Sequence, residues 1–359
     1  MSIFNVFKLL GGLALFLYGM DVMGKALEKQ AGSKLHSILE KLTSSPLKGF
    51  LLGLVVTAII QSSSATTVMV VGFVNSGIMT LRQSIGIILG ANIGTSATSW
   101  ILSLSGLEGD TFWIKMLKPD SFTPILAIIG IFLLMFIKKS NHKDTALIFL
   151  GFAILMFGMD TMSSAVEPLS ESEKFQEILL LFSNPILGVL AGAVLTAIIQ
   201  SSSASVGILQ ALALKCTVTY STAIPIIMGQ NIGTCITAMI SSIGANKNAR
   251  RTAIVHLSFN LLNSTILLIA YSIANGIVDF AFADNSVTPA GIATVHTIFN
   301  VAGACIFLPL TGMLEKLACT IIKDSKNEND NLELLEARFL STPPIAIQHC
   351  KNVSFKMAD

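Results

Sequence analysis

The chain has 359 residues, of which 12% are Asp, Glu, Lys or Arg and 52% are apolar, and its mean hydropathy is +0.73. Soluble globular domains carry about twice that share of charged residues, so this composition excludes a soluble enzyme and indicates a polytopic membrane protein. The formal net charge of +2 decides little, because in a membrane protein the placement of the 23 Lys and Arg residues carries the topological information.

The chain contains a long internal duplication. Residues 12–98 align without a gap onto residues 151–237, at a constant offset of 139 positions and with about two identical positions in five. The longest identical segment, Thr-Ala-Ile-Ile-Gln-Ser-Ser-Ser-Ala, occupies 57–65 and 196–204, and a second one, Asn-Ile-Gly-Thr, occupies 92–95 and 231–234. Because the identities gather at polar residues in apolar surroundings, they indicate a duplicated membrane unit.

In chain order, each repeat predicts a membrane span, an amphipathic stretch, two short apolar runs and a second span. Repeat 1 covers about 9–105 and repeat 2 about 145–243; their first spans are about 9–23 and 145–165. A linking span at 121–137 and additional spans at 252–275 and 288–312 complete a membrane transport domain, 1–313. Residues 314–359 are charged, are expected in the cytoplasm, and are too few to form a core of their own.

The two Gln-Ser-Ser-Ser segments are expected at the tips of re-entrant hairpins. Residues 47–60 form an apolar run of only 14 residues, too short to cross roughly 30 Å of hydrocarbon before the polar segment begins. A polar turn at that depth is tolerated only where protein or a water-filled cavity surrounds it. The expected fold is therefore an all-α polytopic membrane protein with inverted structural repeats, each with a re-entrant helical hairpin.

The lysine distribution predicts that the repeats are inverted. Lys25, Lys29, Lys34, Lys41 and Lys48 lie between the first span and the first hairpin, whereas Lys174 is the one lysine in the matching stretch of repeat 2. Basic residues are retained in the cytoplasm, so the first stretch is expected inside and the second outside. The basic groups at 138–143 and 247–251 then also fall inside, and the acidic loop 279–284 falls outside. This predicts about seven crossings and two hairpins in the cytoplasmic membrane, with the amino terminus outside and the carboxyl terminus inside.

The hairpin tips are the candidate anion site. Half-helix amino termini, hydroxyls and amides can orient a tetrahedral oxyanion and still release it, as a transporter must. The candidate anion ligands are Gln61, Ser62, Ser63, Ser64, Gln200, Ser201, Ser202 and Ser203. Hydrogen bonding between helices is the alternative role for these residues, and the retention of the nonapeptide in both repeats argues against it.

The same regions offer neutral oxygen ligands for a small cation such as sodium, the sole metal expected. Residues 61–98 and 200–237 contain no Asp or Glu, so neutral oxygens and the anion itself would hold the cation. The candidate ligands, including two predicted turns at 92–95 and 231–234, are Gln61, Thr66, Asn92, Thr95, Gln200, Ser205, Asn231 and Thr234. Gly90, Gly94, Gly229 and Gly233 are expected either to allow close packing or to free backbone carbonyls.

Three further groups of residues have more than one possible role. His256 and Asn260, and again His296 and Asn300, form HxxxFN segments; interhelical hydrogen bonding is favoured, and a pair lining the transport pathway is the functional alternative. Asp21 and Asp160 lie near span ends, where ion pairing is as plausible as ion coordination. The five cysteines show no CxxC spacing, and four of them lie in or beside apolar segments, so buried free thiols are expected rather than a metal site or a disulfide framework.

The doubled Gln-Ser-Ser-Ser, each followed by Asn-Ile-Gly-Thr and with HxxxFN segments behind, resembles the bacterial branch of the type II sodium-phosphate cotransporter family. The resemblance covers residues 9 to about 313. It implies sodium-coupled symport of inorganic phosphate, with both tips forming the phosphate site and sodium as coupling ion, and no cofactor. Residues 332–359 resemble the beginning of a helical domain like the PhoU regulator. Lipid surrounds such a protein, a homodimer is a candidate assembly, and no nucleic acid partner is expected.

Two alternatives stay open at this stage. A sodium-independent facilitator or exporter of phosphate or another oxyanion could use the same site chemistry. An intramembrane serine hydrolase, with Ser63 or Ser202 as nucleophile and His256 or His296 as base, is remote, because the sequence lacks a GxSxG elbow and a duplicated nucleophile has no catalytic rationale.

Overall fold

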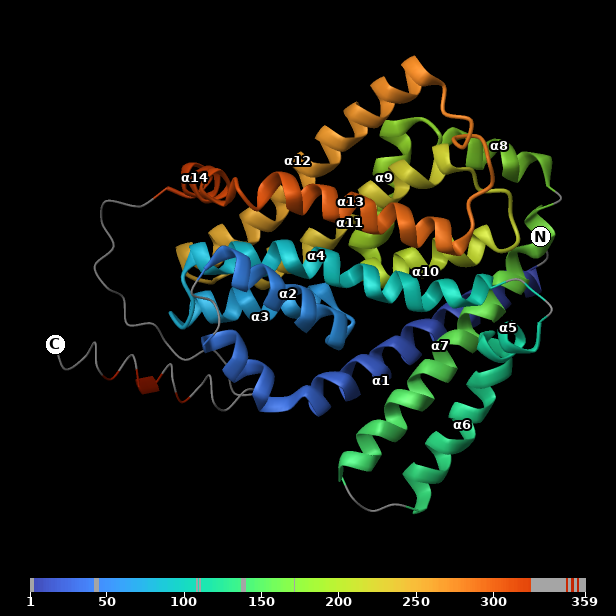
Figure 1. Ribbon diagram of the computed structural model, residues 1–359, viewed down its shortest axis with the longest axis horizontal. Helices are drawn as coiled ribbons and strands as arrows, with labels where there is room; N and C mark the ends of the chain where they lie inside the picture. The colour runs from blue at the N-terminus through green and yellow to red at the C-terminus, as the bar shows by residue number, and fades with distance from the viewer. Residues whose placement is uncertain are drawn as a thin grey trace.

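The structure, a computed structural model, describes residues 3–41, 45–107, 109, 111–136, 140–170 and 172–323, with residues 347, 350, 351 and 354 near the end of the chain. Every regular element in these ranges is a helix (Figure 1). The elements are α1 (Ile3–Lys41), α2 (Pro46–Ile60), α3 (Ser63–Asn75), α4 (Leu81–Ser103), η1 (Leu104–Gly106), α5 (Phe112–Leu117), α6 (Pro119–Phe136), α7 (Ser140–Ser170), α8 (Glu173–Leu181), α9 (Pro185–Ile199), α10 (Ser202–Ala213), α11 (Tyr220–Ser241), α12 (Lys247–Val278), α13 (Pro289–Phe307) and α14 (Thr311–Ile321). The segment expected to resemble PhoU, 332–359, lies almost wholly outside the described residues.

Seven helices in the described part of the chain are long and apolar enough to cross a membrane: all or part of α1, α4, α6, α7, α11, α12 and α13. The short apolar helices form two consecutive pairs, α2 with α3 before α4, and α9 with α10 before α11. A helix of 15 residues, such as α2 or α9, is only about 22 Å long, less than the hydrocarbon thickness. The all-α membrane fold expected from the sequence is therefore confirmed.

Helices α2 and α3 form a hairpin that enters and leaves at the same end of the molecule. The start of α2 packs closely against the start of α4. A Cβ atom added to Gly86 would overlap the carbonyl oxygen of Pro46, so glycine allows this approach. Further along, Gly90 faces Phe50 and Gly94 faces Thr57, so α2 and α4 run side by side in the same direction. Helix α3 then returns, ending at Asn75, close in sequence to the start of α4. The hairpin thus turns back inside the molecule.

Helices α9 and α10 repeat this arrangement against α11. Gly192 of α9 faces the backbone of Ile226, and Gly233 of α11 faces Thr196, so α9 and α11 also run side by side. Helix α8 precedes α9 at a bend of 96°, so the two do not form one straight span. The glycines of α4 and α11 serve close packing, the first of the two roles expected for them.

The first helices of the repeats, α1 and α7, cross each other through reciprocal glycines. Gly12 packs against Gly158, and Gly151 packs against Gly19; the offset of 139 exchanges the members of these two pairs. Such a contact, in which two equivalent surfaces meet, is the signature of a pseudo-two-fold axis. One ion pair reinforces it, between Lys29 Nζ and the buried Asp144 carboxylate at 2.7 Å.

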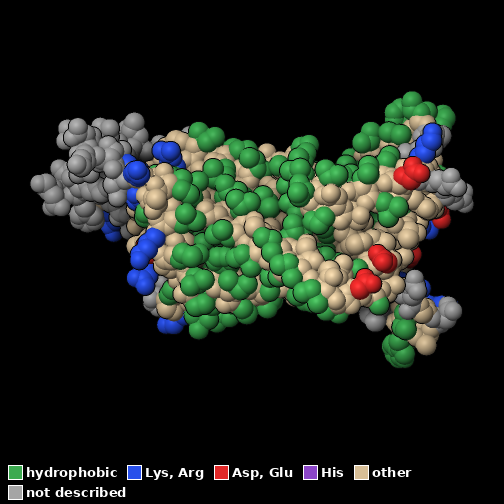
Figure 2. Space-filling view, turned by 90° about the horizontal axis from the view of Figure 1, so that it is seen from above, with side chains coloured by type: hydrophobic (Ala, Val, Ile, Leu, Met, Phe, Trp, Pro, Cys, Tyr) green, Lys and Arg blue, Asp and Glu red, His purple; other side chains and the backbone are tan. Residues whose placement is uncertain are grey.

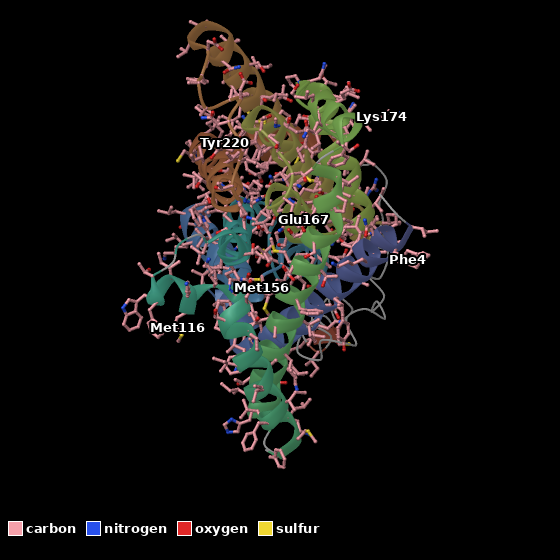
Figure 3. All side chains as sticks on the ribbon, turned by 90° about the vertical axis from the view of Figure 1, so that its right-hand side faces the viewer. Phe4, Met116, Met156, Glu167, Lys174 and Tyr220 are labelled. Atoms are coloured by element: carbon pink, nitrogen blue, oxygen red, sulfur yellow. The ribbon has the colours of Figure 1, made fainter. Side chains whose placement is uncertain are left out.

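Helices α12 and α13 extend the pseudo-symmetry beyond the sequence repeats. Helix α12 contacts α11, while α13 contacts α4, the repeat equivalent of α11. They lie on the side of the molecule opposite α1 and α6 (Figure 1). Helix α6, the span between the repeats, packs mainly on α7, and Figure 3 shows α6 and the first part of α7 extending away from the other helices. Its exposed Ile128, Met135 and Phe136 suit a lipid-facing surface.

The ends of the molecule differ in charge. In Figure 2 the charged side chains at the left end are mainly Lys and Arg, whereas Asp and Glu gather at the right end, together with further Lys and Arg. The basic end holds the starts of α2, α4 and α12. Asn246, before α12, bonds to Asn75 at the end of α3, and Arg251 of α12 donates to the Ile322 carbonyl after α14. The acidic end holds the start of α11 and the loop before α13, joined by the Tyr220 N–H to Asn285 bond. By the positive-inside rule we expect the basic end in the cytoplasm.

The cysteines match their expected state only in part. Cys216 and Cys235 are buried free thiols, and Cys319 is half-buried. Cys305 is exposed on α13, so the expectation that it is buried is wrong; an apolar segment in a membrane protein can face lipid instead of the core.

A cysteine-labelling experiment tests the opposite entry of the two hairpins. Ser45 and Asn184 cap the starts of α2 and α9 at equivalent repeat positions. In a background without native cysteines, Ser45→Cys is expected to react with an impermeant maleimide from the cytoplasmic face and Asn184→Cys from the external face. Asn248→Cys at the basic end and Asn285→Cys at the acidic end are the respective controls. Labelling of Ser45→Cys and Asn184→Cys from one face would refute the inverted arrangement.

Candidate functional site

At the first hairpin tip, one residue with a left-handed backbone conformation connects two helices. Gln61 ends α2 with φ 61°, and its N–H donates to the Thr57 carbonyl at 2.7 Å. Ser62 then caps α3, its Oγ accepting from the Ala65 N–H at 3.1 Å. One of the free N–H groups at the start of α3 is thereby satisfied.

The second tip has the same construction. Gln200 has φ 59° and donates its N–H to the Thr196 carbonyl at 2.7 Å, and Ser201 caps α10 by accepting from the Ala204 N–H at 3.2 Å. Both non-glycine residues therefore adopt a conformation that costs about 1 to 2 kcal/mol for an L-residue. Strain of this kind, retained in both repeats, is typical of functional sites.

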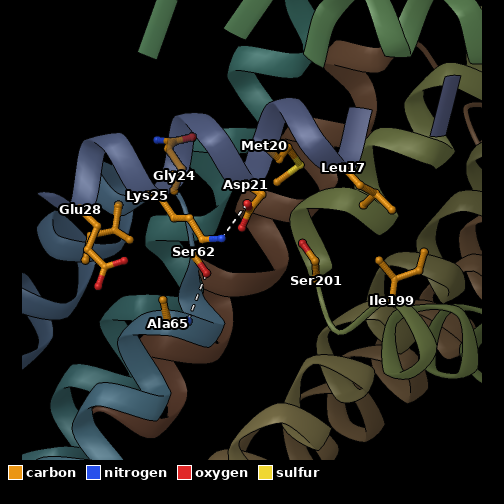
Figure 4. A pocket seen from close by; sticks show the side chains of 12 residues that line it. Leu17, Met20, Asp21, Gly24, Lys25, Glu28, Ser62, Ala65, Ile199 and Ser201 are labelled. Carbon is orange, nitrogen blue, oxygen red and sulfur yellow. Dashed lines mark hydrogen bonds and ion pairs between the residues drawn. The ribbon is translucent and has the colours of Figure 1, made fainter. Parts of the chain in front are cut away.

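The two tips contact each other. The Ser64 hydroxyl lies 3.4 Å from the Gln200 carbonyl oxygen, to which it donates. A cavity of about 420 Å³ opens beside this contact, lined by Gln61 and Ser62 from one tip and by Ser201 from the other (Figure 4). The amino termini of α3 and α10, each carrying a partial positive charge, thus converge on one region.

The other candidate anion ligands lie beside the cavity in sequence but are not among its lining residues: Ser63, Ser64, Gln200, Ser202 and Ser203. Ser63, Ser202 and Ser203 are buried in the first turns of α3 and α10, whereas Gln200 is exposed. Gln61 is buried, and its amide N–H₂ donates to the Ala58 carbonyl. Its Oε1 has no hydrogen-bond partner among the described residues, so an acceptor is left over at the tip.

The candidate cation ligands near the tips differ between the repeats. In repeat 1 the Thr57 hydroxyl donates to Thr66 Oγ1 at 2.9 Å, and the Thr66 hydroxyl donates to the Ser62 carbonyl at 3.1 Å. In repeat 2 the equivalent hydroxyls of Thr196 and Ser205 are buried and have no partner among the described residues. Two hydroxyl oxygens are therefore free to accept a ligand beside the second tip.

The Asn-Ile-Gly-Thr segments are not turns, so that expectation is wrong. They lie within the continuous helices α4 and α11. The amides of Asn92 and Asn231 donate to the carbonyls of Ile88 and Ile227, and the hydroxyls of Thr95 and Thr234 donate one turn back to Ala91 and Gln230. These bonds are compatible with an unbroken helix. The segments still adjoin the tips, because Gly94 packs on Thr57 and Gly233 on Thr196.

The HxxxFN segments contact equivalent positions of the two repeats. His296 Nδ1 lies 2.9 Å from Ser96 Oγ on α4, and Asn260 donates to Cys235 Sγ on α11 at 3.4 Å. Ser96 and Cys235 are related by the offset of 139. Both histidines are buried; His256 has no ring partner among the described residues. None of the four HxxxFN candidates is among the residues lining the tip cavity.

Sequence reasoning missed the third wall of the cavity, which comes from α1. The lining residues of this wall are Leu17, Met20, Asp21, Gly24, Lys25 and Glu28. Their spacing of three or four residues places them on one helix face, and three of them are charged although the span is predominantly apolar. That charged stripe was the available signal; the structure assigns Asp21 to an ion pair with Lys25 at 2.8 Å.

Two re-entrant hairpins that enter from opposite ends and meet at helix amino termini define a membrane transporter built on inverted repeats. The chain belongs to the Na+/Pi-cotransporter family, whose two matches cover residues 15–164 and 154–295. It is thus a member of a transporter family and not an enzyme, which removes the serine hydrolase alternative.

Similar proteins include bacterial and animal members. The chain is 34% identical over 311 residues to "Uncharacterized protein YqeW" of Bacillus subtilis, covering 86% of this chain and 95% of that protein. It is 25% identical over 359 residues to "Putative inorganic phosphate export protein YjbB" of Escherichia coli, covering 99% of this chain but only 63% of YjbB. A segment of 98 residues, 27% of this chain and 14% of the relative, is 40% identical to human "Sodium-dependent phosphate transport protein 2B". No solved structure matches the chain.

The left-handed tips make a stability prediction. The glycine variants Gln61→Gly and Gln200→Gly should be more stable than the alanine variants Gln61→Ala and Gln200→Ala, because glycine adopts positive φ without strain. We expect a free energy of unfolding higher by about 1 kcal/mol, and a correspondingly higher Tm. Gln176, exposed within the helix α8, is the control: there alanine should be the more stable. Thermal unfolding in detergent measures the relative stability of the glycine and alanine variants at the tips and at Gln176. Equal or higher stability of the alanine variants at the tips would contradict the strain.

Proposed function

We propose that the protein is a secondary active transporter that carries inorganic phosphate across the cytoplasmic membrane by symport with sodium. The observation that carries this proposal is the convergence of two serine-capped helix amino termini on one cavity. The family description, Na+/Pi-cotransporter, names both the cargo and the coupling ion.

The tips suit a phosphate that must be released again. Backbone N–H groups at the starts of α3 and α10 and the hydroxyls of Ser62, Ser63, Ser201 and Ser202 offer hydrogen bonds from two sides. No arginine lines the cavity among the described residues, so bidentate clamping of the anion is absent there. Gln61, Ser64, Gln200 and Ser203 complete the proposed phosphate site.

Sodium is proposed to bind at neutral oxygens beside each tip. In repeat 2 these are the free hydroxyls of Thr196 and Ser205, next to Gln200, Asn231 and Thr234. In repeat 1 Thr66, Gln61, Asn92 and Thr95 are the equivalent group, with Thr57 already bonded to Thr66. Hard neutral oxygens suit an alkali cation, and the phosphate charge would compensate it.

Export or sodium-independent movement of phosphate or another oxyanion is the second candidate. It is favoured by YjbB, named as a putative phosphate export protein, which aligns with 99% of this chain. Phosphate uptake by proteoliposomes with and without an inward sodium gradient separates the two.

The HxxxFN residues His256, Asn260, His296 and Asn300 are proposed to hold α12 and α13 against the repeats, with a role in the pathway as the alternative.

Removing one hydroxyl from each tip tests the phosphate site. Ser63→Ala and Ser202→Ala should each weaken phosphate binding by about 1.5 to 3 kcal/mol, or tenfold and more, the contribution of a hydrogen bond to a charged group. Ser183→Ala, whose hydroxyl bonds to the Leu180 carbonyl between α8 and α9, should leave affinity unchanged. Calorimetric titration with phosphate measures this. Unchanged affinity in either tip variant would remove that tip from the site.

Sodium and phosphate should bind interdependently. In a low-dielectric cavity each ion is costly alone, so each should stabilise the other by the same factor. Titration of the solubilised protein with phosphate should therefore give a higher affinity in sodium buffer than in choline buffer. Equal affinity in the two buffers would contradict symport and favour the facilitator.

A further inference from the structure

One face of α1 brings charge to the hairpin tips. Lys25 is the sole positively charged member of the twelve described residues that line the tip cavity, and Asp21 and Glu28 flank it on the same face of α1 (Figure 4). The proposed phosphate ligands at the tips are all uncharged. Lys25 is thus the one side chain of this wall that attracts an anion.

Lys25 is paired but accessible. Its Nζ lies 2.8 Å from Asp21 Oδ2, while the two side chains are 74% and 53% exposed. Both residues lie within the apolar span 3–31. Ionisable groups at such positions face the interior of the bundle or a water-filled cavity. The pair therefore borders the same cavity as Ser62 and Ser201.

The pair does not hold α1 in place. The opposite face of α1, with Gly12, Phe16, Gly19 and Met23, packs on α7. The contact with α7 is reinforced by Lys29 and Asp144. An exposed pair four residues apart on one helix contributes little to stability. The fold consequently gives no structural reason for a lysine at position 25.

Of the three charged positions on this face of α1, only position 25 differs between the repeats. The offset of 139 relates Asp21 to Asp160 and Glu28 to Glu167, but it relates Lys25 to Ser164. The carboxylates are thus common to both repeats, whereas the lysine belongs to α1 alone. Of the two symmetry-related faces, only that of α1 carries a lysine of its own; on α7 the cation comes from Lys215, after α10, which pairs with Glu167 at 3.1 Å.

We propose that Lys25 is a phosphate-recruiting residue whose ammonium is held by Asp21 until a phosphate enters the cavity and competes for it. The proposal rests on the proposed phosphate transport and adds a charged residue to that site. Asp21 and phosphate compete for one ammonium group, so loss of Asp21 and loss of Lys25 must change phosphate affinity in opposite directions. If the pair only stabilised α1, the two substitutions would change phosphate affinity in the same direction.

The test is phosphate uptake into proteoliposomes at saturating sodium. Lys25→Gln should raise the KM for phosphate about fivefold with little change in kcat, as expected for an exposed charge contact, and Lys25→Arg should restore it. Asp21→Asn should lower the KM. Asp160→Asn is the matched control, because this exposed carboxylate has Ser164 in place of a lysine, and it should leave the KM unchanged.

The outcomes separate this inference from the proposed function. If Lys25→Gln and Asp21→Asn both raise the KM, or if neither changes it, the competition is refuted while phosphate transport stands. If the unaltered protein neither binds nor transports phosphate, the proposed function itself fails. Should Lys25→Gln not fold, as judged by its Tm, the direction of the Asp21→Asn effect still decides, because a brace predicts a raised KM.

Discussion

Two helices that begin in the interior of a membrane protein impose the constraint on which the rest of the structure depends. Each presents backbone N–H groups at a depth where lipid cannot satisfy them, and Ser62 and Ser201 cap only one donor each. Protein must therefore surround both tips. The glycines of α4 and α11 allow α2 and α9 to lie against backbone, and α1 covers the tips from a third side. What remains uncovered is the cavity, where a ligand can complete the hydrogen bonding.

The pseudo-symmetry is broken where binding chemistry is proposed. Thr57 and Thr66 bond to each other, but their equivalents Thr196 and Ser205 do not. Ser96 meets a histidine ring, whereas Cys235, its equivalent, receives an asparagine amide. Inverted repeats provide two related conformations of one scaffold, and substitutions of this kind let the ligand sites of the two halves differ.

The predictions from sequence succeeded where a short segment carried enough information. An apolar run too short to cross a membrane, ending in a repeated polar segment, was sufficient to predict the re-entrant hairpins. The Asn-Ile-Gly-Thr segments were predicted wrongly as turns, because asparagine, glycine and threonine favour turns in isolation. In the structure their side chains bond to their own helix, and the glycines serve contact with α2 and α9. The charged stripe on α1 was visible at its spacing of three and four residues, but nothing in the sequence said which surface it faces.

The sequence by itself determined the helical class, the duplication and the location of the hairpin tips, because these depend on local hydrophobicity and on a repeated pattern within one chain. Only the tertiary structure decided that Ser64 reaches the Gln200 backbone, that α13 occupies on α4 the place that α12 occupies on α11, and that Lys25 faces the cavity. These contacts join residues far apart in the chain, and they follow from the packing of whole helices, which no local pattern specifies.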